Sequence, residues 1–336
     1  MNYITQLKER SYPNCLENVD TVAISGHIRP DGDCVGSCLG LCTYLLDQNP
    51  NLVVDVYLDS IPDQFRFLKY ADRIRQENED HVVYDLCVAL DCSEPERLNR
   101  AGEIFEQAKR TICIDHHITN EGFGDISIVC PESSSASELL YYILKDQRLF
   151  GQGPISMDCA QALYMGIVHD TGVFRHSNTN LEAMTAAGEL IGYGLNTEKI
   201  ITDTFYKKTY RQNQLLGKAL LESILMLNGA MIFTALYRKD FEVFGCDHKD
   251  TDGIIDQLRV TEGVHVALLL YETKEGEFKV SLRSDELVDV AVIASEFGGG
   301  GHVRAAGCTA YGQMHDIVTN IASRVESQLM EQDEAE

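Results

Sequence analysis

Short, nearly continuous apolar runs constrain the fold of the first half of the chain most strongly. They lie at 21–25 (TVAIS), 52–58 (LVVDVYL), 86–91 (LCVALD) and 111–115 (TICID). Helices are predicted at 35–46, 95–109 and 136–149. Continuous apolar strands separated by helices indicate a mainly parallel sheet that is covered on both faces. The first half is therefore expected to be an α/β domain, with sites where the carboxyl ends of the strands open into loops.

A second α/β pattern begins after a helix-rich segment. Helices are predicted at 158–168, 181–193 and 211–226, and strands return at 230–237, 264–271 and 277–282. Further helices are predicted at 252–260, 288–297 and 315–330. This alternation predicts a smaller C-terminal α/β domain with a mixed sheet. The expected division is a first domain over 1–195, a helical linker over 196–226, a second domain over 227–330 and an acidic tail over 331–336.

The charge of the chain limits its partners. It holds 28 Lys and Arg against 52 Asp and Glu, which gives a formal net charge of −24. Stable binding of long nucleic acid depends on many Lys and Arg contacts to phosphate, so a long polyanion is not an expected partner. A small phosphorylated compound held in a local basic or metal-lined pocket remains compatible with this charge.

Cysteine usage and hydropathy predict a cytoplasmic protein. No apolar run reaches the length of a membrane span, and the first residues, MNYITQLKER, lack the apolar core of a signal peptide. The cysteines number 11, an odd count with no CxxC pair. Cys34, Cys38 and Cys42 repeat every four residues on a predicted helix. A soft-metal site is one interpretation, but packing on one helix face is favoured, because a single face gives poor tetrahedral geometry.

Three of the predicted strands end in residues that bind metals. His27, Asp31 and Asp33 follow the first strand, Asp91 ends the third, and Asp115, His116 and His117 end the fourth. Neighbouring parallel strands bring such residues to one edge of the sheet. Mixed imidazole and carboxylate ligands suit Mn²⁺, Fe²⁺, Co²⁺ or Zn²⁺. Divalent cations would also relieve the repulsion among so many carboxylates.

Asp170 is expected at the same edge. It ends a predicted helix whose apolar positions would pack on the sheet. Any of these pieces alone is weak, because a single Asp after a strand is usually a cap or turn residue and DGD is a common surface turn. Their joint occurrence in this order is far more specific.

The combined pattern resembles a known superfamily. HxxxDxD at 27–33, a strand-terminal Asp91, DHH at 115–117 and DTG at 170–172 are similar to the DHH phosphoesterases. In the second half, SLRS at 281–284, GGGGH at 298–302 and AAG at 305–307 resemble the DHH-associated C-terminal domain. The resemblance covers about residues 20–310, which is nearly the whole chain.

The resemblance implies a catalytic site with two divalent metal ions, of which Mn²⁺ is favoured. One ion would be held by His27, Asp31 and Asp91, and the other by Asp33, Asp91, His116 and Asp170, with Asp91 bridging. Asp115 would orient the histidines, and His117 would face the substrate. Two such cations lower the pKa of a shared water, so hydrolysis needs no Ser or Cys nucleophile.

Substrate-binding residues are implied in the second domain. Arg283 resembles a phosphate or nucleobase clamp, since guanidinium binds phosphate in a bidentate manner. Gly299, Gly300, Gly301 and His302 would form an anion-binding loop from successive backbone N–H groups; a merely flexible glycine loop is the alternative. The roles of His169 and Asp256 stay open.

Length and architecture point to one branch of the superfamily. The compact chain is similar to the NrnA-like oligoribonucleases, which implies hydrolysis of very short RNA, including dinucleotides such as pApA, to 5′-mononucleotides. Removal of the 3′-phosphate of 3′-phosphoadenosine 5′-phosphate is a further implied activity. Alternatives are a cyclic di-AMP phosphodiesterase and a catalytically silent nucleotide-binding module. Self-association as a homodimer through the first domain is left open.

Overall fold

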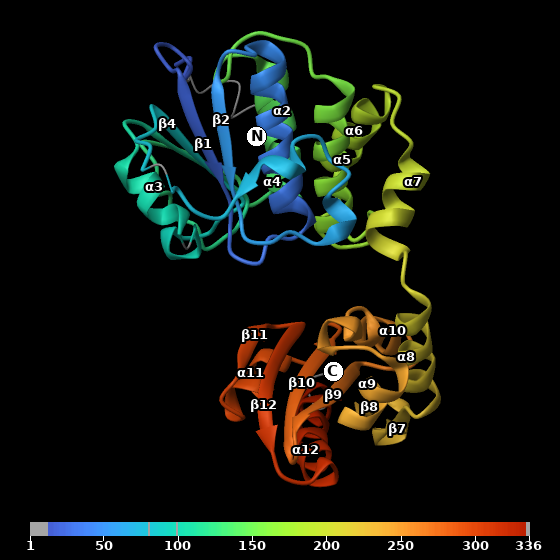
Figure 1. The fold of residues 1–336 in the computed structure, drawn as a ribbon. Coiled ribbons are helices and arrows are strands. Elements are labelled where there is room, and N and C mark those ends of the chain that lie inside the picture. Colours follow the sequence, from blue (N-terminus) through green and yellow to red (C-terminus); the bar gives the residue numbers. More distant parts are fainter. Residues whose placement is uncertain (1–12, 80, 99, 334–336) are drawn as a thin grey trace. The chain divides into compact units, whose positions relative to one another are not determined.

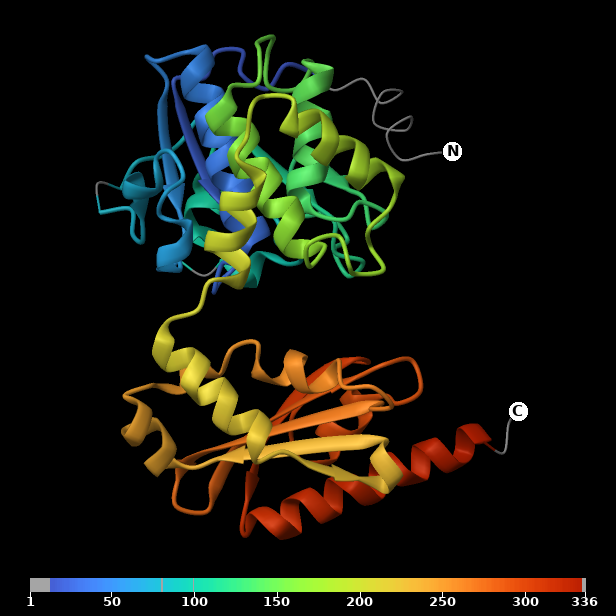
Figure 2. The same cartoon turned by 90° about the vertical axis from the view of Figure 1, so that its right-hand side faces the viewer.

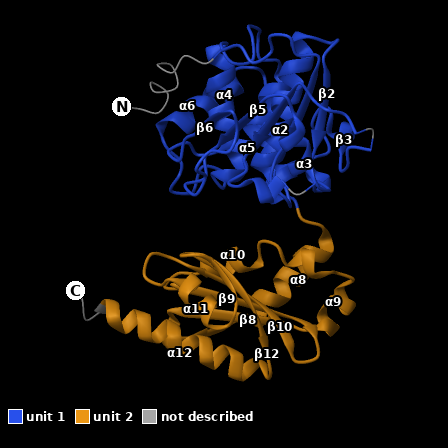
Figure 3. Cartoon of the chain, turned by 90° about the vertical axis from the view of Figure 1, so that its left-hand side faces the viewer, with its two compact units in different colours: residues 1–207 blue, residues 208–336 orange. Residues whose placement is uncertain are grey.

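The computed structural model describes residues 13–79, 81–98 and 100–333, and the chain divides into two compact units (Figure 3). Unit 1 is Met1–Lys207 and unit 2 is Lys208–Glu336. The segment 196–226, expected to be a linker, is shared between them: α7 (Thr197–Ile201) belongs to unit 1 and α8 (Tyr210–Leu221) to unit 2. Residues 1–12 of the expected first domain lie outside the described residues. Helix α12 (Met314–Asp333) includes the start of the expected acidic tail, whose last residues 334–336 also lie outside them.

Unit 1 is built on a fully parallel six-stranded sheet with the order β3-β2-β1-β4-β5-β6. Its strands are β1 (Thr21–Ser25), β2 (Val53–Tyr57), β3 (Ile74–Arg75), β4 (Leu86–Leu90), β5 (Thr111–Asp115) and β6 (Ile126–Val129). The chain moves outward from β1 to β3, returns to the centre, and continues outward in the other direction from β4. Beside β1 and β4 the order therefore reverses, which is where open α/β sheets form their sites.

Helices cover both faces of this sheet (Figure 1). On one face lie α2 (Gly32–Gln48) and α4 (Ala136–Asp146). Helix α5 (Met157–Asp170) packs mainly against these two helices, whereas it was expected to pack on the sheet, and α6 (Leu181–Ile191) packs outside it. The other face carries α3 (Ala101–Gln107). Val22 and Ile24 of β1 pack into the first core and Ala23 into the second, as the alternation of side chains along a strand requires. The continuous apolar runs are thus explained by burial on both faces.

Small residues let α2 and α5 approach closely. A Cβ added to Gly36 would lie 2.6 Å from the carbonyl oxygen of Ala162. One added to Gly166 would collide with Ser137 Oγ and would lie 2.9 Å from Asp33 Oδ1. Any larger residue at 166 would therefore displace the start of α4 or the Asp33 carboxylate. The packing of these three helices is what brings Asp33 next to the end of α5.

Unit 2 holds a mixed six-stranded sheet with the order β11-β12-β10-β9-β8-β7, in which only β8 and β9 among these strands pair in parallel. The strands are β7 (Ile224–Met226), β8 (Met231–Leu236), β9 (Val266–Lys274), β10 (Glu277–Ser284), β11 (Gly300–His302) and β12 (Ala305–Tyr311). Helices α11 (Val290–Glu296) and α12 pack into one core, and α8, α9 (Arg238–Phe244) and α10 (Ile254–Arg259) into the other. Figure 2 shows α12 (red) running along this sheet.

The fold class is therefore the predicted one, and the differences are local. The helix predicted over 95–109 is divided into a 3₁₀ turn, η3 (Pro95–Leu98), and α3. The helix predicted over 211–226 ends at Leu221, and β7 follows. Short turns complete the chain: η1 (Asp63–Phe65), η2 (Ala71–Arg73), a π-helical turn η4 (Thr202–Tyr206), η5 (Leu227–Gly229) and η6 (His248–Thr251).

Two further expectations are addressed by the described residues. All cysteines are free, and Cys34, Cys38 and Cys42 are fully buried. None of the described helices is both long and apolar enough to cross a membrane.

Candidate metal centre

The sequence-predicted ligands of unit 1 come from five elements that meet at the carboxyl edge of the sheet. His27 follows β1, and Asp31 and Asp33 lie at the start of α2. Asp91 follows β4, and the 115–117 triplet begins on the last residue of β5. Asp170 is the last residue of α5. In the described part of the chain, three groups of side chains have ligand atoms within 4.8 Å of one another: His27, Cys34 and Asp91; Asp91, His116 and His117; Asp33, His116 and Asp170.

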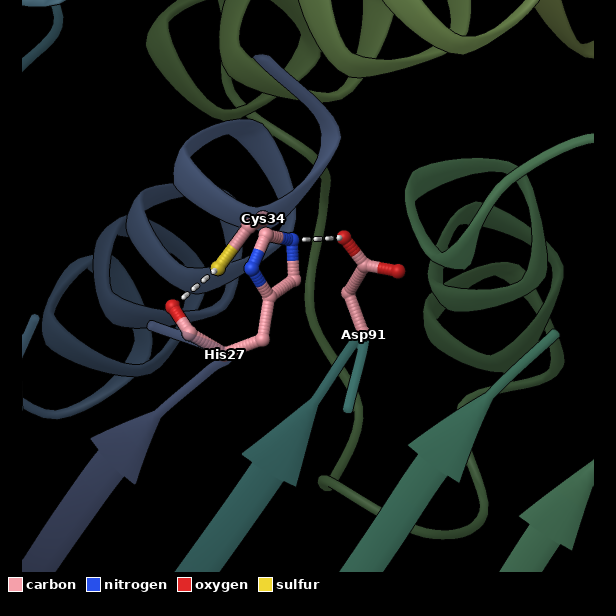
Figure 4. Close-up of side chains that lie close together, drawn as sticks. All are labelled: His27, Cys34 and Asp91. Atoms are coloured by element: carbon pink, nitrogen blue, oxygen red, sulfur yellow. Dashed lines mark hydrogen bonds and ion pairs between the residues drawn. The ribbon is translucent and has the colours of Figure 1, made fainter. Parts of the chain in front are cut away.

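His27 is oriented by its own loop. Its Nδ1 lies 2.8 Å from the carbonyl oxygen of Ile28, to which it donates, so Nε2 is left as the atom that can bind a metal. Nε2 lies 3.4 Å from Asp91 Oδ2 and 3.7 Å from Asp31 Oδ2. Figure 4 shows the ring edge of His27 directed at the Asp91 carboxylate. The three ligands expected for one ion are thus brought together.

Asp31 has a second task as the N-cap of α2. Its Oδ1 accepts hydrogen bonds from the backbone N–H groups of Asp33 (3.0 Å) and Cys34 (3.1 Å). Capping uses one carboxylate oxygen and leaves Oδ2 on the side of His27. The DGD turn therefore starts the helix and leaves one carboxylate oxygen of Asp31 facing His27.

Asp91 lies between the two sets of ligands. It has a positive φ of 52°, which is uncommon for a residue other than glycine, and its side chain is buried. Oδ2 faces His27, while Oδ1 lies 3.5 Å from Nε2 of His116 and has no hydrogen-bond partner among the described residues. A buried carboxylate oxygen without a partner is costly. This oxygen is positioned for a cation.

Asp33 is held by the first turn of α4. Its two oxygens accept hydrogen bonds from the backbone N–H groups of Ala136 (2.6 Å) and Ser137 (2.9 Å). Two N–H groups at a helix N-terminus are a favourable site for a carboxylate. The same carboxylate lies 3.9 Å from His116 Nε2. Ordering of Asp33 thus depends on a segment about one hundred residues away in the sequence.

His116 and Asp170 complete the second set. Nε2 of His116 lies 3.8 Å from Asp170 Oδ2, so this one imidazole nitrogen faces Asp33, Asp91 and Asp170 together. These are the four residues expected to hold the second ion.

Asp115 contacts His117 of the two histidines that follow it. Its Oδ1 accepts a hydrogen bond of 2.8 Å from Nδ1 of His117, and its Oδ2 accepts one of 2.7 Å from Nδ2 of Asn120. The bond to Asp115 leaves Nε2 of His117 for a ligand or substrate. The contact of Asn120 with Asp115 was not predicted from the sequence. The surrounding residues, ITNEG at 118–122, indicate only a turn.

The loop after Asp170 has an unusual backbone. Gly172, Val173 and Phe174 have φ of 54°, 58° and 61°, three successive left-handed residues. For a β-branched residue such as Val173 this costs on the order of 1–3 kcal/mol. The loop is held by buried Thr171, whose Oγ1 accepts from the N–H of Phe174 and donates to the carbonyl oxygen of Ile167. The turn carries Asn178 back to Asp170, where its Nδ2 donates to Oδ2 (3.3 Å) and to the backbone oxygen (3.2 Å).

Cys34 is the neighbour that sequence reasoning assigned to packing alone. Its thiol donates to the carbonyl oxygen of His27 at 3.9 Å, and Figure 4 shows it beside His27. Burial raises the pKa of the Cys34 thiol well above its usual value. Cys34 is thus buried beside His27, and its raised pKa is consistent with the favoured packing interpretation.

The carboxylates of this centre repel one another, and burial together with this repulsion shifts the pKa values of two of them. Burial, together with the charges of Asp91 and Asp170, raises the pKa of Asp33, and burial and the charge of Asp91 raise the pKa of Asp170 to about 6. Burial would lower the pKa of His116, but the nearby carboxylates of Asp91, Asp33 and Asp170 raise it to about 10. The clustered carboxylates therefore favour positive charge at this position.

The donor set fits divalent cations. Imidazole nitrogens and carboxylate oxygens converge, and Asp91 directs its unpartnered Oδ1 toward His116 and its Oδ2 toward His27. Such mixed N and O ligands suit borderline divalent metals. A divalent cation held by such residues could acidify a bound water and polarise an oxygen of a bound molecule.

His169 has a structural environment. Thr204 Oγ1 donates to the carbonyl oxygen of Ile200, so it accepts the Nε2–H of His169 at 2.9 Å. The imidazole packs against the rings of Phe65 and Phe205. Burial lowers its pKa to about 4. His169 thus joins α5 to η4 as a neutral side chain.

The residues singled out in unit 2 lie on and beside β10 and β11. Arg283 of β10 pairs with Asp256 of α10, with Nε 3.4 Å from Oδ1. The glycine run is ordered: Gly300 to His302 form β11, which pairs with β12. Gly301 has φ of 149°, and a Cβ there would lie 2.5 Å from the carbonyl oxygen of Ala305. The pairing with β12 favours a defined backbone at 300–302 over a merely flexible loop.

Comparison with known proteins places this geometry in a family. The model of the DHH family, N-terminal domain, matches residues 21–167, and that of the DHHA1 domain matches residues 232–329. The bifunctional oligoribonuclease and PAP phosphatase NrnA of Thermus thermophilus is 33% identical over 292 residues, which cover 87% of this chain and 84% of that protein. The cyclic-di-AMP phosphodiesterase PdeA of Listeria monocytogenes is 28% identical over 90% of this chain, but only 47% of that longer protein is covered.

A solved structure supports the same assignment. The crystal structure of an exopolyphosphatase-related protein from Bacteroides fragilis matches with a TM-score of 0.82 and 26% identity, covering 97% of this chain and 96% of that one. The predicted motifs 27–33 and 115–117 lie inside the first matched domain, and 298–302 lies inside the second. The chain thus belongs to the DHH family of phosphoesterases, with a DHH domain in its first half and a DHHA1 domain in its second.

Proposed function

We propose that this enzyme is a two-metal hydrolase of very short RNA, and that it also acts on 3′-phosphoadenosine 5′-phosphate. The observation that carries the proposal is the position of Asp91, one carboxylate whose two oxygens face His27 and His116 in separate ligand groups. A shared carboxylate of this kind suits a pair of ions better than one. His27 and Asp31 would complete one ion's ligands; Asp33, His116 and Asp170 would complete those of the other. Mn²⁺ is the favoured ion.

The side chains of unit 1 would divide the work of hydrolysis. When bound, the divalent cations would supply an acidified water and neutralise charge on the phosphate oxygens. The first turn of α4 fixes Asp33, and the Ile28 carbonyl fixes the ring of His27, so these ligands need no rearrangement. His117, held by Asp115, would direct Nε2 at the substrate phosphate or its leaving oxygen.

Unit 2 would bind the nucleotide beyond the bond that is cut. Arg283 would contact phosphate or nucleobase, and Gly299, Gly300, Gly301 and His302 would supply backbone and imidazole groups to an anion. Two features support this role. His302 and the glycines are exposed at an edge strand, and Arg283 has only one acidic partner, at 3.4 Å, among the described ion pairs.

The size of the substrate follows from charge and from the relatives. A chain of net charge −24 has too little basic surface for a long single strand. The Thermus thermophilus relative is named for oligoribonuclease and PAP phosphatase activities, and it matches over most of both chains. Both activities involve small nucleotides with a hydrolysable phosphate ester. Hydrolysis of pApA and oligonucleotides of a few residues would release 5′-mononucleotides.

A cyclic di-AMP phosphodiesterase is the second candidate. The Listeria monocytogenes relative carries that name and is matched over most of this chain. Less than half of that protein is covered, so the first proposal has the better support. A catalytically silent binding module is disfavoured, because each of the expected ligand positions holds a metal-binding residue type.

A substrate panel would test the proposal. Metal-stripped enzyme would be given Mn²⁺ and incubated with pApA, a five-nucleotide RNA, 3′-phosphoadenosine 5′-phosphate, cyclic di-AMP and a long single strand, and products would be resolved chromatographically. Turnover of the first three alone is the expected result. Exclusive turnover of cyclic di-AMP would favour the second candidate, and no turnover with any divalent metal would favour the silent module.

A further inference from the structure

The side chain of Asn178 connects two parts of the centre that come from different helices. Its Nδ2 donates to the carbonyl oxygen of Ser134 (3.0 Å), to the backbone oxygen of Asp170 (3.2 Å) and to Asp170 Oδ2 (3.3 Å). Ser134 lies two residues before Ala136, whose N–H holds Asp33. The backbone N–H groups of Ala136 and Ser137 form what we call the Asp33 cradle. One amide therefore links the loop just before this cradle to the carboxylate of Asp170.

The orientation of this amide is fixed by its neighbours. A carboxamide nitrogen carries two hydrogens and its oxygen carries none. All three contacting atoms are oxygens that can only accept, so exchanging Nδ2 and Oδ1 would place four oxygens together. The geometry allows one hydrogen to reach Ser134 and the other to be shared by the two Asp170 oxygens. Asn178 thus acts as a donor toward the metal ligand.

The backbone is built to present Asn178 in this position. The three left-handed residues 172–174 reverse the chain after Asp170, although Val173 and Phe174 adopt this conformation at a cost. Both side chains pack against the core of unit 1, and the Thr171 hydroxyl holds the turn. A strained, well-anchored turn beside a functional carboxylate is typical of a preorganised site.

We propose that Asn178 is the positioning residue of the second ion, the one assigned to Asp33, His116 and Asp170. It holds the Asp170 carboxylate 3.8 Å from His116 and fixes its distance from the Asp33 cradle. The inference rests on the proposed two-metal centre and assigns to Asn178 no contact with substrate. Without the amide, Asp170 would have to be ordered by the ion alone, and the affinity for that ion would fall.

The test is direct binding of Mn²⁺ to the full, metal-stripped chain without substrate. Calorimetric titration would be compared for wild type, Asn178→Ala, Asn178→Leu and Asp170→Asn. Leu approximates the volume of Asn but has no donor, so it separates hydrogen bonding from packing. Loss of an outer partner of a metal ligand typically weakens binding by about 10–100-fold. That loss is expected for one ion in both Asn178 variants, in the same ion that Asp170→Asn weakens, with the other ion unchanged.

Asn180→Ala is the matched control. Asn180 lies two residues further on, caps α6 and donates to the carbonyl oxygen of Glu132 at 2.9 Å, but it contacts no expected ligand. Like Asn178, it connects the loop before α4 to the loop before α6, so its variant measures the effect of weakening the contact between these loops. Unchanged Mn²⁺ affinity is expected in this variant. Excess Mn²⁺ should restore the kcat of Asn178→Ala, because a higher concentration of the ion offsets its weaker affinity.

The outcomes separate this inference from the proposed function. Wild-type affinity in both Asn178 variants overturns it, as does an equal loss of both ions, or a loss matched by Asn180→Ala. A wild-type chain that binds a single ion to which Asp170 does not contribute also overturns it. If the ions bind as expected but no substrate in the panel is hydrolysed, the proposed function fails and the role of Asn178 stands.

Discussion

The Oδ1 atom of Asp91 lies 3.5 Å from Nε2 of His116, and it is a buried oxygen with no hydrogen-bond partner among the described residues. The other oxygen of this carboxylate faces His27. Asp91 is placed there by the end of β4 and by its positive φ, which turns the side chain back over the sheet edge. This relationship makes Asp91 the residue on which both expected ligand sets depend.

Replacing Asp91 should therefore remove activity. Asp91→Asn keeps the shape but loses the charge, and a fall in kcat/KM of more than about 100-fold is expected, since even outer partners of metal ligands cost 10–100-fold. Asp85→Asn is the control: Asp85 precedes the same strand, pairs with Lys109 and lies at its opposite end. Assays with pApA would compare the two variants, and an Asp91→Asn enzyme as active as Asp85→Asn would disprove the assignment.

His117 should affect catalysis more than metal binding. His117→Gln removes the imidazole that Asp115 orients, and loss of a general acid or phosphate donor typically costs about 10²–10⁴-fold in kcat. Mn²⁺ affinity should change less than in His116→Gln, because His116 faces three carboxylates. Calorimetry and steady-state kinetics on both variants would check this. If His117→Gln lost more Mn²⁺ affinity than His116→Gln, His117 would be the metal ligand and the present assignment of the two histidines would be wrong.

Metal affinity should rise with pH. Without a metal ion the pKa of His116 is raised to about 10, so its imidazole is protonated at neutral pH, and that of Asp170 is raised to about 6, so it takes up a proton below neutral pH. Binding must release these protons, and acid therefore favours the metal-free form. From pH 6 to pH 8 the apparent Mn²⁺ affinity should increase by about 10-fold per pH unit or more, if at least one proton is released. Titrations at three pH values would measure the slope.

His315→Gln is a suitable control for the pH experiment. His315 is in the first turn of α12 in unit 2 and belongs to none of the ligand groups. It should leave the slope unchanged. An affinity that is the same at all three pH values would show that the ligands are already unprotonated.

Asp256 should limit the binding of highly charged substrates. Its ion pair with Arg283 is largely exposed, so Asp256→Asn should change stability by less than about 1 kcal/mol. Loss of the carboxylate frees the guanidinium and removes a negative charge, so KM should fall more for pApA than for ApA. Asp252→Asn, an exposed acid near the same helix, should alter neither KM. Equal KM shifts for both dinucleotides would exclude charge discrimination.

Two neighbouring glycines should respond differently to alanine. Gly301 has φ of 149° and its added Cβ would lie 2.6 Å from Ala306 Cα, whereas an added Cβ on Gly300 meets nothing within 4 Å. Gly301→Ala should destabilise unit 2 by more than about 1 kcal/mol, and Gly300→Ala should have little effect. Hydrogen exchange of the β12 amides in the full chain would report both. Equal protection in the two variants would contradict the strained geometry.

The sequence by itself identified the fold class and the ligand types. Continuous apolar runs and the residues that follow them are local features, so His27, Asp91 and His116 could be assigned to strand ends without knowing how the strands pair. Helix ends were predicted less well. The stretch 224–226 continues the apolar pattern of α8, and only pairing with β8 makes it a strand.

Only the tertiary structure decided how those ligands are held. Asp33 is held by the N–H groups of Ala136 and Ser137, which are distant in the sequence. The direction of the side chains decides that Asp115 bonds to His117 and not to His116. Asn178 reaches Asp170 through a turn of positive φ, which a β-branched residue such as Val173 would not predict. Gly300 to His302 are assigned to a strand because they pair with β12. Each of these features is either a contact between distant segments or a backbone conformation imposed by packing. The local pattern of apolar residues predicts neither kind of feature.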